Sequence, residues 1–490
     1  MDTEYLRTLS DQELAIELAK GNIDRRTLAQ VRPDPMARKK VIQLSQNVDL
    51  DAENRKAQYE EERRWKYAKE SDDADELLAF IEDYPTSTHV GEARRIVNNL
   101  KNLTRNRAFA ARELAIEIGD FQRNKRLTDE QVENGIKNAI IRRLNNKQIT
   151  KDDFLNLLKE DNNLINAHTV NTLIQENIID PSDLSDIGID DRFIYKLTKN
   201  TTPQNYNGEY RPLRKIDWSS TEVYFWGVPS SGKSCAIGAI LSAAFSGTMT
   251  KSIEPNTASQ GYGYMNHLKD VFRQGNIISL VAGTAKTSFY EMGFTLIDNE
   301  RKRHRITLID MAGELMQCLY KKDADESQLT DADKEMLETL NSVLVSNRTK
   351  SRKMHFFVIE YGVEDREGQV SQDTYLRGAM NYLRSLKIFN NDTDAIFIMI
   401  SKADKAKTND IGEFGRYIQS HYKGFFKDLC QICEDYEING KKLESLAFSL
   451  GNVCFQNYCL FDPRSAELVV RTLLDRTPVE RSIWGKIFSN

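Results

Sequence analysis

The sequence predicts an α/β domain with a mostly parallel six-stranded sheet, helices on both faces and one antiparallel edge strand, preceded by an all-α N-terminal region. Two observations predict this arrangement. Residues 1–198 place apolar side chains at three- and four-residue spacing without a sustained period of two, which is typical of helices. From about residue 220, short apolar runs alternate with helix-like segments, as expected for parallel strands covered on both faces.

The domain boundaries follow from where this pattern changes. A chain of 490 residues is too long for one ordinary core and predicts two or three domains. The polar stretch from Lys199 to Pro212 is rich in turn formers and separates the two patterns. We therefore expect a helical interaction or adaptor region of one or two small units at residues 1–198, followed by a linker at 199–219. The α/β domain is expected at residues 220–478 and a C-terminal tail at 479–490.

The composition limits the classes of partner. Hydrophobic residues make up 40% and charged residues 29%, the balance of a globular protein. A net charge of -5 gives no general attraction to nucleic acid or anionic lipid. The first residues lack the pattern of a secretory signal, and the longest apolar runs, such as Ala395 to Ile400, are too short to span a bilayer. We expect a cytoplasmic protein with no membrane span and no nucleic-acid partner, and its six cysteines fit a reducing compartment.

The helical region carries repeated helix-start signals. In the stretch from Ile179 to Leu184 an apolar residue precedes the capping position, Pro181 occupies the first helical position, and a second apolar residue follows. Residues 77–84 and 90–100 resemble half of a tetratricopeptide-type repeat. Two interpretations remain open, ordinary well-capped helical packing and an adaptor that docks another protein.

A glycine-rich loop follows the first predicted strand. Val223 to Trp226 is apolar, and the G-x4-G-K-S pattern of residues 227–234 leads into an apolar helical run. Glycines let backbone N–H groups curl around phosphates, and the helix N-terminus adds positive potential. Lys233 is expected to meet the β- and γ-phosphate oxygens and the Ser234 hydroxyl to ligate Mg2+. The sequence therefore predicts a nucleoside triphosphate site at Gly227, Pro229, Ser230, Ser231, Gly232, Lys233, Ser234 and Cys235.

Two further strands are predicted as a hairpin that ends in a second motif. Residues 294–297 and 305–309 are separated by a charged turn, and the second strand runs directly into Asp310-Met311-Ala312-Gly313. An aspartate at the carboxyl end of a strand can hold Mg2+ through water, and a glycine three residues later lets the backbone approach the γ-phosphate. Asp310 and Gly313 are the expected residues.

The order of strand, phosphate loop, hairpin and D-x-A-G resembles a Ras-like P-loop GTPase domain of the translation-factor-related class. The resemblance covers about residues 220 to 475 and implies further strands at 355–361, 395–400 and 446–451. In this family N-K-x-D or T-K-x-D after the fifth strand selects guanine, and here residues 401–404 read S-K-A-D. The resemblance implies that Asp404 accepts hydrogen bonds from the base, that the stem of Lys402 covers the ring, and that Ser449 and Leu450 supply backbone contacts.

The resemblance also implies Mg2+-dependent hydrolysis of GTP to GDP and phosphate by in-line attack of water. In this family a threonine that precedes the second strand closes over the metal. Thr287 fits that spacing best, with Thr284 second. The expected catalytic residues are Lys233, Thr287 and Glu314, and the expected metal ligands are Ser234, Thr287 and Asp310. Glu314 stands where a glutamine commonly orients the water, so its carboxylate either acts as a base or repels the phosphate.

Three functional hypotheses follow. The first is a GTP-hydrolysing molecular switch whose helical region couples the nucleotide state to a protein partner, with hydrolysis that is slow or dependent on that partner. The second, motivated by Glu314, is a nucleotide-binding scaffold with little turnover. The third is a P-loop ATPase in which the S-K-A-D sequence is accidental. The sequence leaves the partner and the oligomeric state open.

Overall fold

A computed structural model of the chain describes residues 3–71, 73–124, 126–199, 206–273, 277–281, 284, 287–363, 370–406 and 410–480. Contacts within it form two compact units. The first, here called the helical unit, contains Met1–Leu114 and Arg143–Asp153, and the second, the sheet unit, contains Ala115–Arg142 and Phe154–Asn490. The division falls inside residues 1–198, the helical region expected to contain one or two small units, and not at the predicted linker. Residues 200–205 of that linker and 481–490 of the predicted tail lie outside the described residues.

The helical unit is built from capped helices around two small apolar cores. Ser10 and Glu13 form a reciprocal capping box, in which the Glu13 backbone N–H donates to the Ser10 hydroxyl at 3.3 Å and the Ser10 N–H donates to the Glu13 carboxylate at 2.6 Å. Trp65 packs on Phe80 with ring centroids 5.3 Å apart, so the predicted helical hairpin shares its core with the preceding helix. The helices are α1 (Thr3–Thr8), α2 (Asp11–Ala19), α3 (Arg25–Val31), α4 (Pro35–Gln46), α5 (Leu50–Glu70), α6 (Ala74–Asp83) and the first part of α7 (Val90–Arg123).

Further helices belong largely to the sheet unit, namely α8 (Asp129–Asn145), α9 (Lys151–Glu160), α10 (Ala167–Gln175), α11 (Pro181–Asp186) and α12 (Asp191–Thr198). The start of α10 packs on a hairpin turn near the end of the chain. The Ala167 N–H donates to the Phe455 carbonyl and the Phe455 N–H to the Asn162 carbonyl, both at 2.9 Å. These bonds explain why the helices after residue 154 fold with the sheet.

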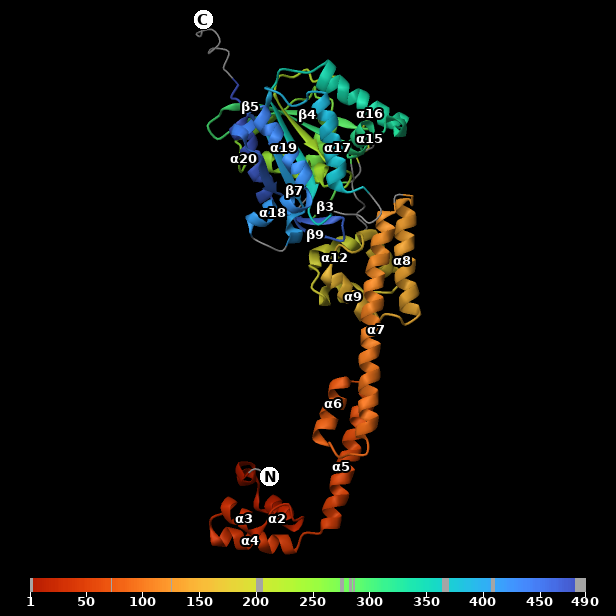
Figure 1. The fold of residues 1–490 in the computed structure, drawn as a ribbon, viewed down its shortest axis with the longest axis vertical. Coiled ribbons are helices and arrows are strands. Elements are labelled where there is room, and N and C mark those ends of the chain that lie inside the picture. Colours follow the sequence, from red (N-terminus) through yellow and green to blue (C-terminus); the bar gives the residue numbers. More distant parts are fainter. Residues whose placement is uncertain are drawn as a thin grey trace. The chain divides into compact units, whose positions relative to one another are not determined.

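Among the described residues, seven strands form one mostly parallel sheet in the order β2-β4-β5-β1-β6-β7-β8 (Figure 1). Their bounds are β1 (Thr221–Trp226), β2 (Ser252–Pro255), β4 (Phe289–Ile297), β5 (Arg303–Met311), β6 (Lys353–Glu360), β7 (Thr393–Ser401) and β8 (Glu444–Ala447). The predicted hairpin forms as β4 and β5, with Ile297 opposite Arg303. The pairs β5–β1, β1–β6, β6–β7 and β7–β8 are parallel, which confirms the predicted mostly parallel sheet.

Two details of the predicted sheet are wrong. The sheet has seven described strands instead of six, and the antiparallel strand β4 is not at the edge, because β2 pairs with it on the outside. Strand β2 has only four residues, of which Ser252 and Glu254 are exposed, so it leaves no apolar run in the sequence.

A second sheet of three strands was not predicted. It has the order β3-β10-β9, with β3 (Ile277–Ser279), β9 (Gly451–Cys454) and β10 (Tyr458–Phe461). Because β8 ends at Ala447, residues 446–451 do not form one strand as expected. The chain turns after β8 and enters this second sheet, which places Ser449 and Leu450 in the connection.

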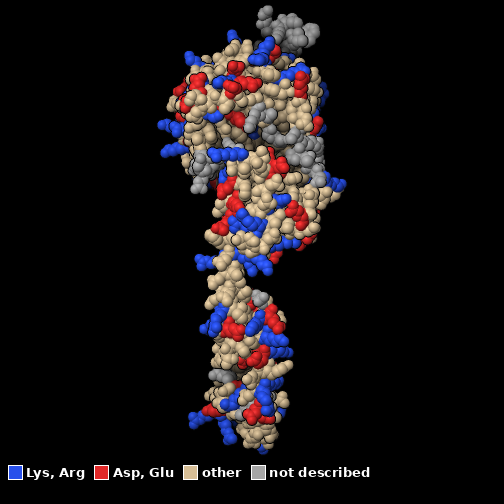
Figure 2. All heavy atoms as spheres, turned by 90° about the vertical axis from the view of Figure 1, so that its right-hand side faces the viewer, with Lys and Arg blue, Asp and Glu red and all other residues tan. Residues whose placement is uncertain are grey.

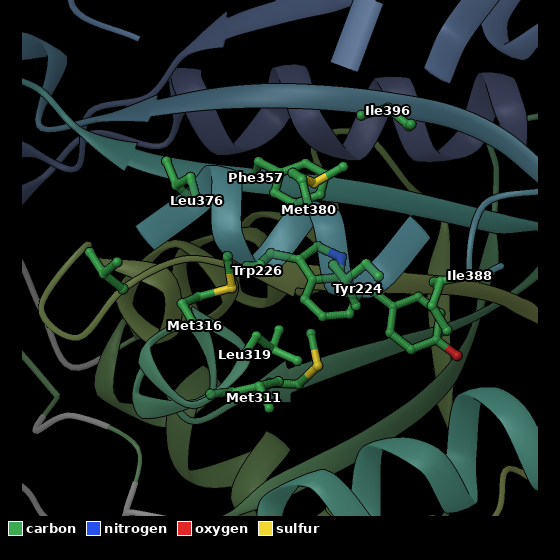
Figure 3. Close-up of a cluster of buried hydrophobic side chains, with 14 of the residues drawn as sticks. Tyr224, Trp226, Met311, Met316, Leu319, Phe357, Leu376, Met380, Ile388 and Ile396 are labelled. Atoms are coloured by element: carbon green, nitrogen blue, oxygen red, sulfur yellow. The ribbon is translucent and has the colours of Figure 1, made fainter. Parts of the chain in front are cut away.

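Helices cover both faces of the large sheet (Figure 1). On one face Tyr224, Trp226 and Phe357 pack against Leu319 and Met380 of the covering helices (Figure 3). The alternate residues of the same strands face the opposite helices, so all six positions of β1 are buried. The first face carries α15 (Glu314–Ala324), α16 (Asp331–Asn341), α17 (Gln372–Ser385), α18 (Ile411–His421) and α19 (Lys423–Asp435), and the second α13 (Lys233–Phe245), α14 (Tyr262–Val271) and α20 (Arg464–Arg476).

The second half of the predicted linker is part of the sheet unit. Leu213 and Ile216 are buried in its core, and the ring of Tyr206 meets that of Tyr264 edge-on at 5.3 Å. Acidic and basic side chains are interspersed on the face that Figure 2 shows. Within the described ranges, no helix combines the length and apolar character needed to cross a bilayer.

Candidate functional site

The glycine-rich loop connects β1 to α13 as the sequence predicted. Gly232 caps α13 with φ +87°, in the left-handed region where a residue without Cβ has no steric penalty. Ser230 also has a positive φ of 66° and is exposed. Ser231 is buried, and its carbonyl accepts a hydrogen bond from the Ser401 hydroxyl at 2.6 Å. The loop is therefore curled at the N-terminus of a long helix and tied to the end of β7.

Lys233 is buried and folds back on the loop. Its ammonium group donates to the Gly227 carbonyl at 2.9 Å and approaches the Val228 carbonyl at 3.4 Å. Burial lowers the pKa of Lys233, while the carboxylates of Asp310 and Glu314 act in the opposite direction. The loop thus already holds one cation, and Glu314, the first residue of α15, lies near enough to act on its charge.

Three hydroxyl groups meet one carboxylate oxygen at the end of β5. Asp310 Oδ2 accepts from the Ser234 hydroxyl at 3.0 Å, from the Thr284 hydroxyl at 2.9 Å and from the Tyr264 hydroxyl at 3.0 Å. Ser234 and Thr284 also contact each other at 2.6 Å. Asp310 is completely buried, and this burial raises its pKa, opposed chiefly by the charge of Lys233.

The threonine at this cluster is Thr284, which corrects the preference for Thr287. Thr287 has a positive φ of 69°, and its carbonyl accepts from the Tyr210 hydroxyl at 3.3 Å. The sequence ranked the two threonines by spacing alone. The segment between α13 and β4 contains β2, α14 and β3, so spacing could not show which threonine returns to Ser234.

Gly313 lies directly against the glycine-rich loop. A Cβ at this position would stand 2.5 Å from both the N and Cα atoms of Pro229 and 2.8 Å from the carbonyl carbon of Val228. Only a residue without a side chain allows the end of β5 and the start of α15 to approach the loop this closely. The D-x-A-G segment and the loop therefore form one continuous backbone surface.

Residues of the S-K-A-D turn meet the connection between β8 and β9. The Ser449 hydroxyl donates to Asp404 Oδ1 at 2.8 Å, and the Ala403 N–H donates to the Phe448 carbonyl at 3.2 Å. The Leu450 carbonyl accepts from the Asp462 N–H at 2.8 Å. Asp404 is exposed, so its second carboxylate oxygen is open to an approaching donor.

Lys402 has a partner that the sequence did not indicate. Its ammonium group donates to Glu360 Oε1 at 2.7 Å, and the backbone at Lys402 is left-handed with φ +54°. Glu360 ends β6 and stands opposite Ser401 in the parallel register. An acidic residue at the carboxyl end of the neighbouring strand was the only available signal.

Cys235 follows Ser234 in α13, and burial raises the pKa of its thiol to about 11.

The cluster has the donors that Mg2+ prefers. Ser234, Thr284 and Asp310 supply hydroxyl and carboxylate oxygens, and the buried Oδ1 of Asp310 makes no hydrogen bond to another described residue. Across the described residues, no group of three His, Cys, Asp or Glu side chains could hold a metal. A cation bound by few protein ligands, which completes its shell with water and phosphate oxygens, fits this donor set.

Comparisons with known proteins add no assignment. No profile of a known protein family matches the chain, and a search of curated proteins finds no match. The functional argument therefore depends on the geometry of the site.

Proposed function

We propose that this chain binds GTP together with Mg2+ and hydrolyses the GTP to GDP and phosphate. The observation that carries the proposal is the contact between the Ser234 hydroxyl and Asp310 Oδ2 at 3.0 Å. Ser234 is in the first turn of the helix that follows β1. Asp310 is the second-last residue of the neighbouring parallel strand β5, where it stands opposite Phe225 in the register. A hydroxyl and a carboxylate at adjacent strand ends, beside a curled loop, suit a phosphate-bound Mg2+.

The loop and helix supply the phosphate-binding chemistry. Helix α13 has 13 residues, so the backbone N–H groups at its start carry a partial positive charge toward an anion. Lys233 would exchange its bonds to the loop carbonyls for bonds to phosphate oxygens. Ser234, Thr284 and Asp310 would hold Mg2+, which supplies positive charge to the phosphates when bound.

The base would bind between the S-K-A-D turn and the connection after β8. Guanine presents two adjacent donors, N1–H and the 2-amino group, which match the two oxygens of a carboxylate such as Asp404. Adenine lacks this pair of donors. The bond from Ser449 to Asp404 Oδ1 and the ion pair of Lys402 with Glu360 fix the turn that carries both residues.

Binding of fluorescent GTP and ATP analogues with Mg2+ tests the base assignment. Hydrogen bonds to a charged group contribute about 1.5–3 kcal/mol each, so Asp404→Ala should weaken GTP binding by about 100-fold or more. Inosine triphosphate, which lacks the 2-amino group, should bind the wild type with intermediate affinity. Asp475→Ala, at an exposed position of α20, is the matched control and should bind GTP as the wild type does.

ATP binding equal to GTP binding, and unchanged by Asp404→Ala, would reject the guanine assignment and favour a P-loop ATPase.

Turnover is tested separately by steady-state phosphate release. The charge of Glu314 acts on Lys233, so its carboxylate lies close to where the terminal phosphate would bind. We expect slow release in the wild type and no release in Lys233→Ala. Tight GTP binding without any phosphate release by the wild type would instead support the nucleotide-binding scaffold.

We also propose that the helical unit docks a protein partner. Tyr59 on α5 is 71% exposed, and Leu103 and Phe109 on α7 are 49% and 65% exposed. Exposed large apolar side chains are one mark of protein-binding surfaces. A triple substitution of these residues to serine should abolish partner capture and leave GTP affinity unchanged, as measured by co-purification and nucleotide titration.

A further inference from the structure

A buried tyrosine contacts the carboxylate expected to face Mg2+. Tyr264 of α14 is 4% exposed, and its hydroxyl donates to Asp310 Oδ2 at 3.0 Å. The same hydroxyl lies 3.5 Å from the Thr284 hydroxyl. Because a carboxylate oxygen accepts, Tyr264 is the hydrogen-bond donor in this contact.

The ring of Tyr264 is fixed by other aromatic side chains. It stacks on the ring of Tyr290 with centroids 3.9 Å apart and an interplanar angle of 21°. Tyr290 stands directly opposite Asp310 in the register of β4 and β5. On another side, Tyr206 meets the Tyr264 ring edge-on at 69°. These contacts hold the hydroxyl over one oxygen of Asp310.

The three hydroxyl groups that donate to Asp310 Oδ2 differ in whether they would also bind the cation. The hydroxyls of Ser234 and Thr284 are expected to bind Mg2+ through their oxygens, so a bound cation would set the direction of their O–H groups. Tyr264 has no such role, so its bond can persist and fix the carboxylate while Oδ1, which is buried without a partner among the described residues, serves the cation. Partners of this kind orient the groups that bind a metal.

We propose that Tyr264 is a positioning residue that orients the Asp310 carboxylate for Mg2+. This inference rests on the proposed function. It assigns a role to α14, an element that the motif order of the sequence did not include.

A Mg2+ titration of GTP affinity tests the proposal. Tyr264→Phe removes one hydroxyl and keeps the ring. We expect the Mg2+ concentration for half-maximal GTP binding to rise about 10- to 100-fold, with GTP affinity in EDTA unchanged. Tyr290→Phe is the matched control, because its hydroxyl bonds to Ser288 and its ring stacks in the same cluster. That variant should keep the wild-type Mg2+ midpoint, and the melting temperatures of both variants establish that they fold.

The outcomes separate the two proposals. Absence of GTP binding by the wild type overturns the proposed function and this inference with it. When the wild type binds Mg2+-dependently, a Tyr264→Phe midpoint equal to or below that of the wild type overturns the positioning role alone. Equal loss of affinity with Mg2+ and in EDTA also overturns it, because the tyrosine then supports the whole loop and not the metal carboxylate.

Discussion

At the residue scale, the contact of Gly313 with Pro229 is the tightest constraint on the site. Any Cβ at Gly313 meets backbone atoms, which cannot rotate away as a side chain can. Overpacking of this kind costs about 1–3 kcal/mol. The strain would fall on the glycine-rich loop, since the atoms that this Cβ would meet belong to Val228 and Pro229.

We predict that Gly313→Ala weakens GTP binding by about 5- to 150-fold, which corresponds to an overpacking cost of about 1–3 kcal/mol. Gly415→Ala in α18 is the control, because a Cβ there meets no atom within 4 Å. That control should stabilise its helix slightly, since alanine has the higher helix propensity. Nucleotide titration and thermal unfolding measure the two effects, and unchanged affinity in Gly313→Ala would show that the loop does not hold the phosphates.

His355 gives the sheet unit a predicted dependence on pH. Its ring is completely buried in β6, and its Nδ1 accepts from the indole N–H of Trp226 at 3.0 Å. Burial, aided by the charge of Lys353, lowers the pKa of His355 to about 3. The folded protein therefore keeps this imidazole neutral at a pH where the unfolded chain protonates it.

Stability should fall as the pH decreases from about 6.5 to about 3, by up to about 1.4 kcal/mol per pH unit from this group. Above that window neither state binds the proton and the contribution is constant. His355→Gln keeps an acceptor for Trp226 but does not titrate. The free energy of unfolding, measured with urea, should therefore no longer show this part of the pH dependence. His421→Gln, at an exposed position, should keep it; identical slopes in all three proteins would contradict the assignment.

At the element scale, the turn between β9 and β10 joins the helices after residue 154 to the loops of the site. Phe455 and Gln456 lie in the three-residue connection between the paired residues Cys454 and Tyr458, and both are left-handed, with φ of 51° and 58°. The side chain of Asn163 binds this turn. Its Oδ1 accepts from the Gln456 N–H and its Nδ2 donates to the Val453 carbonyl, both at 2.9 Å. Strand β9 begins at Gly451, directly after Ser449 and Leu450.

We predict that Asn163→Ala destabilises the sheet unit by about 1–2 kcal/mol, because the side-chain hydrogen bonds to the Gln456 N–H and to the Val453 carbonyl are both lost. Amide exchange at Gln456 should accelerate in parallel. Asn452→Ala, at an exposed position of β9, serves as the control and should change neither measurement. Unchanged exchange at Gln456 in Asn163→Ala would mean that the turn is held by the backbone bonds alone.

At the scale of the whole molecule, each of the two compact units contains buried apolar clusters of its own. The apolar residues of the helical unit form clusters around Leu14 and Trp65, whereas the sheet unit has large clusters on either face of its sheet. Units with separate cores can unfold in separate steps. A ligand stabilises only the unit to which it binds.

Calorimetry should therefore show two transitions, of which Mg2+ and GTP raise one. At a ligand concentration of about 100 times Kd the bound unit gains about 2.7 kcal/mol. Asp404→Ala should remove this shift and leave the transition of the helical unit in place. A single transition that GTP raises would instead show that the two units unfold as one.

The sequence by itself determined the features that depend on short stretches of chain. The run from Val223 to Ser234 contains its strand, loop and helix start within a few residues, and the alternation of residues 294–309 predicts a hairpin without knowledge of any other segment. Apolar runs in the later strands predicted the parallel sheet, because strands buried on both faces need apolar side chains at nearly every position.

Only the tertiary structure decided which distant residues meet. Tyr264 and Thr284 reach Asp310 from 46 and 26 residues away, and their positions depend on the path of the inserted segment with β2, α14 and β3. The same holds for Glu360 beneath Lys402, and for the helices after residue 154 that join the sheet unit. Local patterns record how a side chain is buried, but not which chain segment buries it, so a single sequence does not specify these contacts.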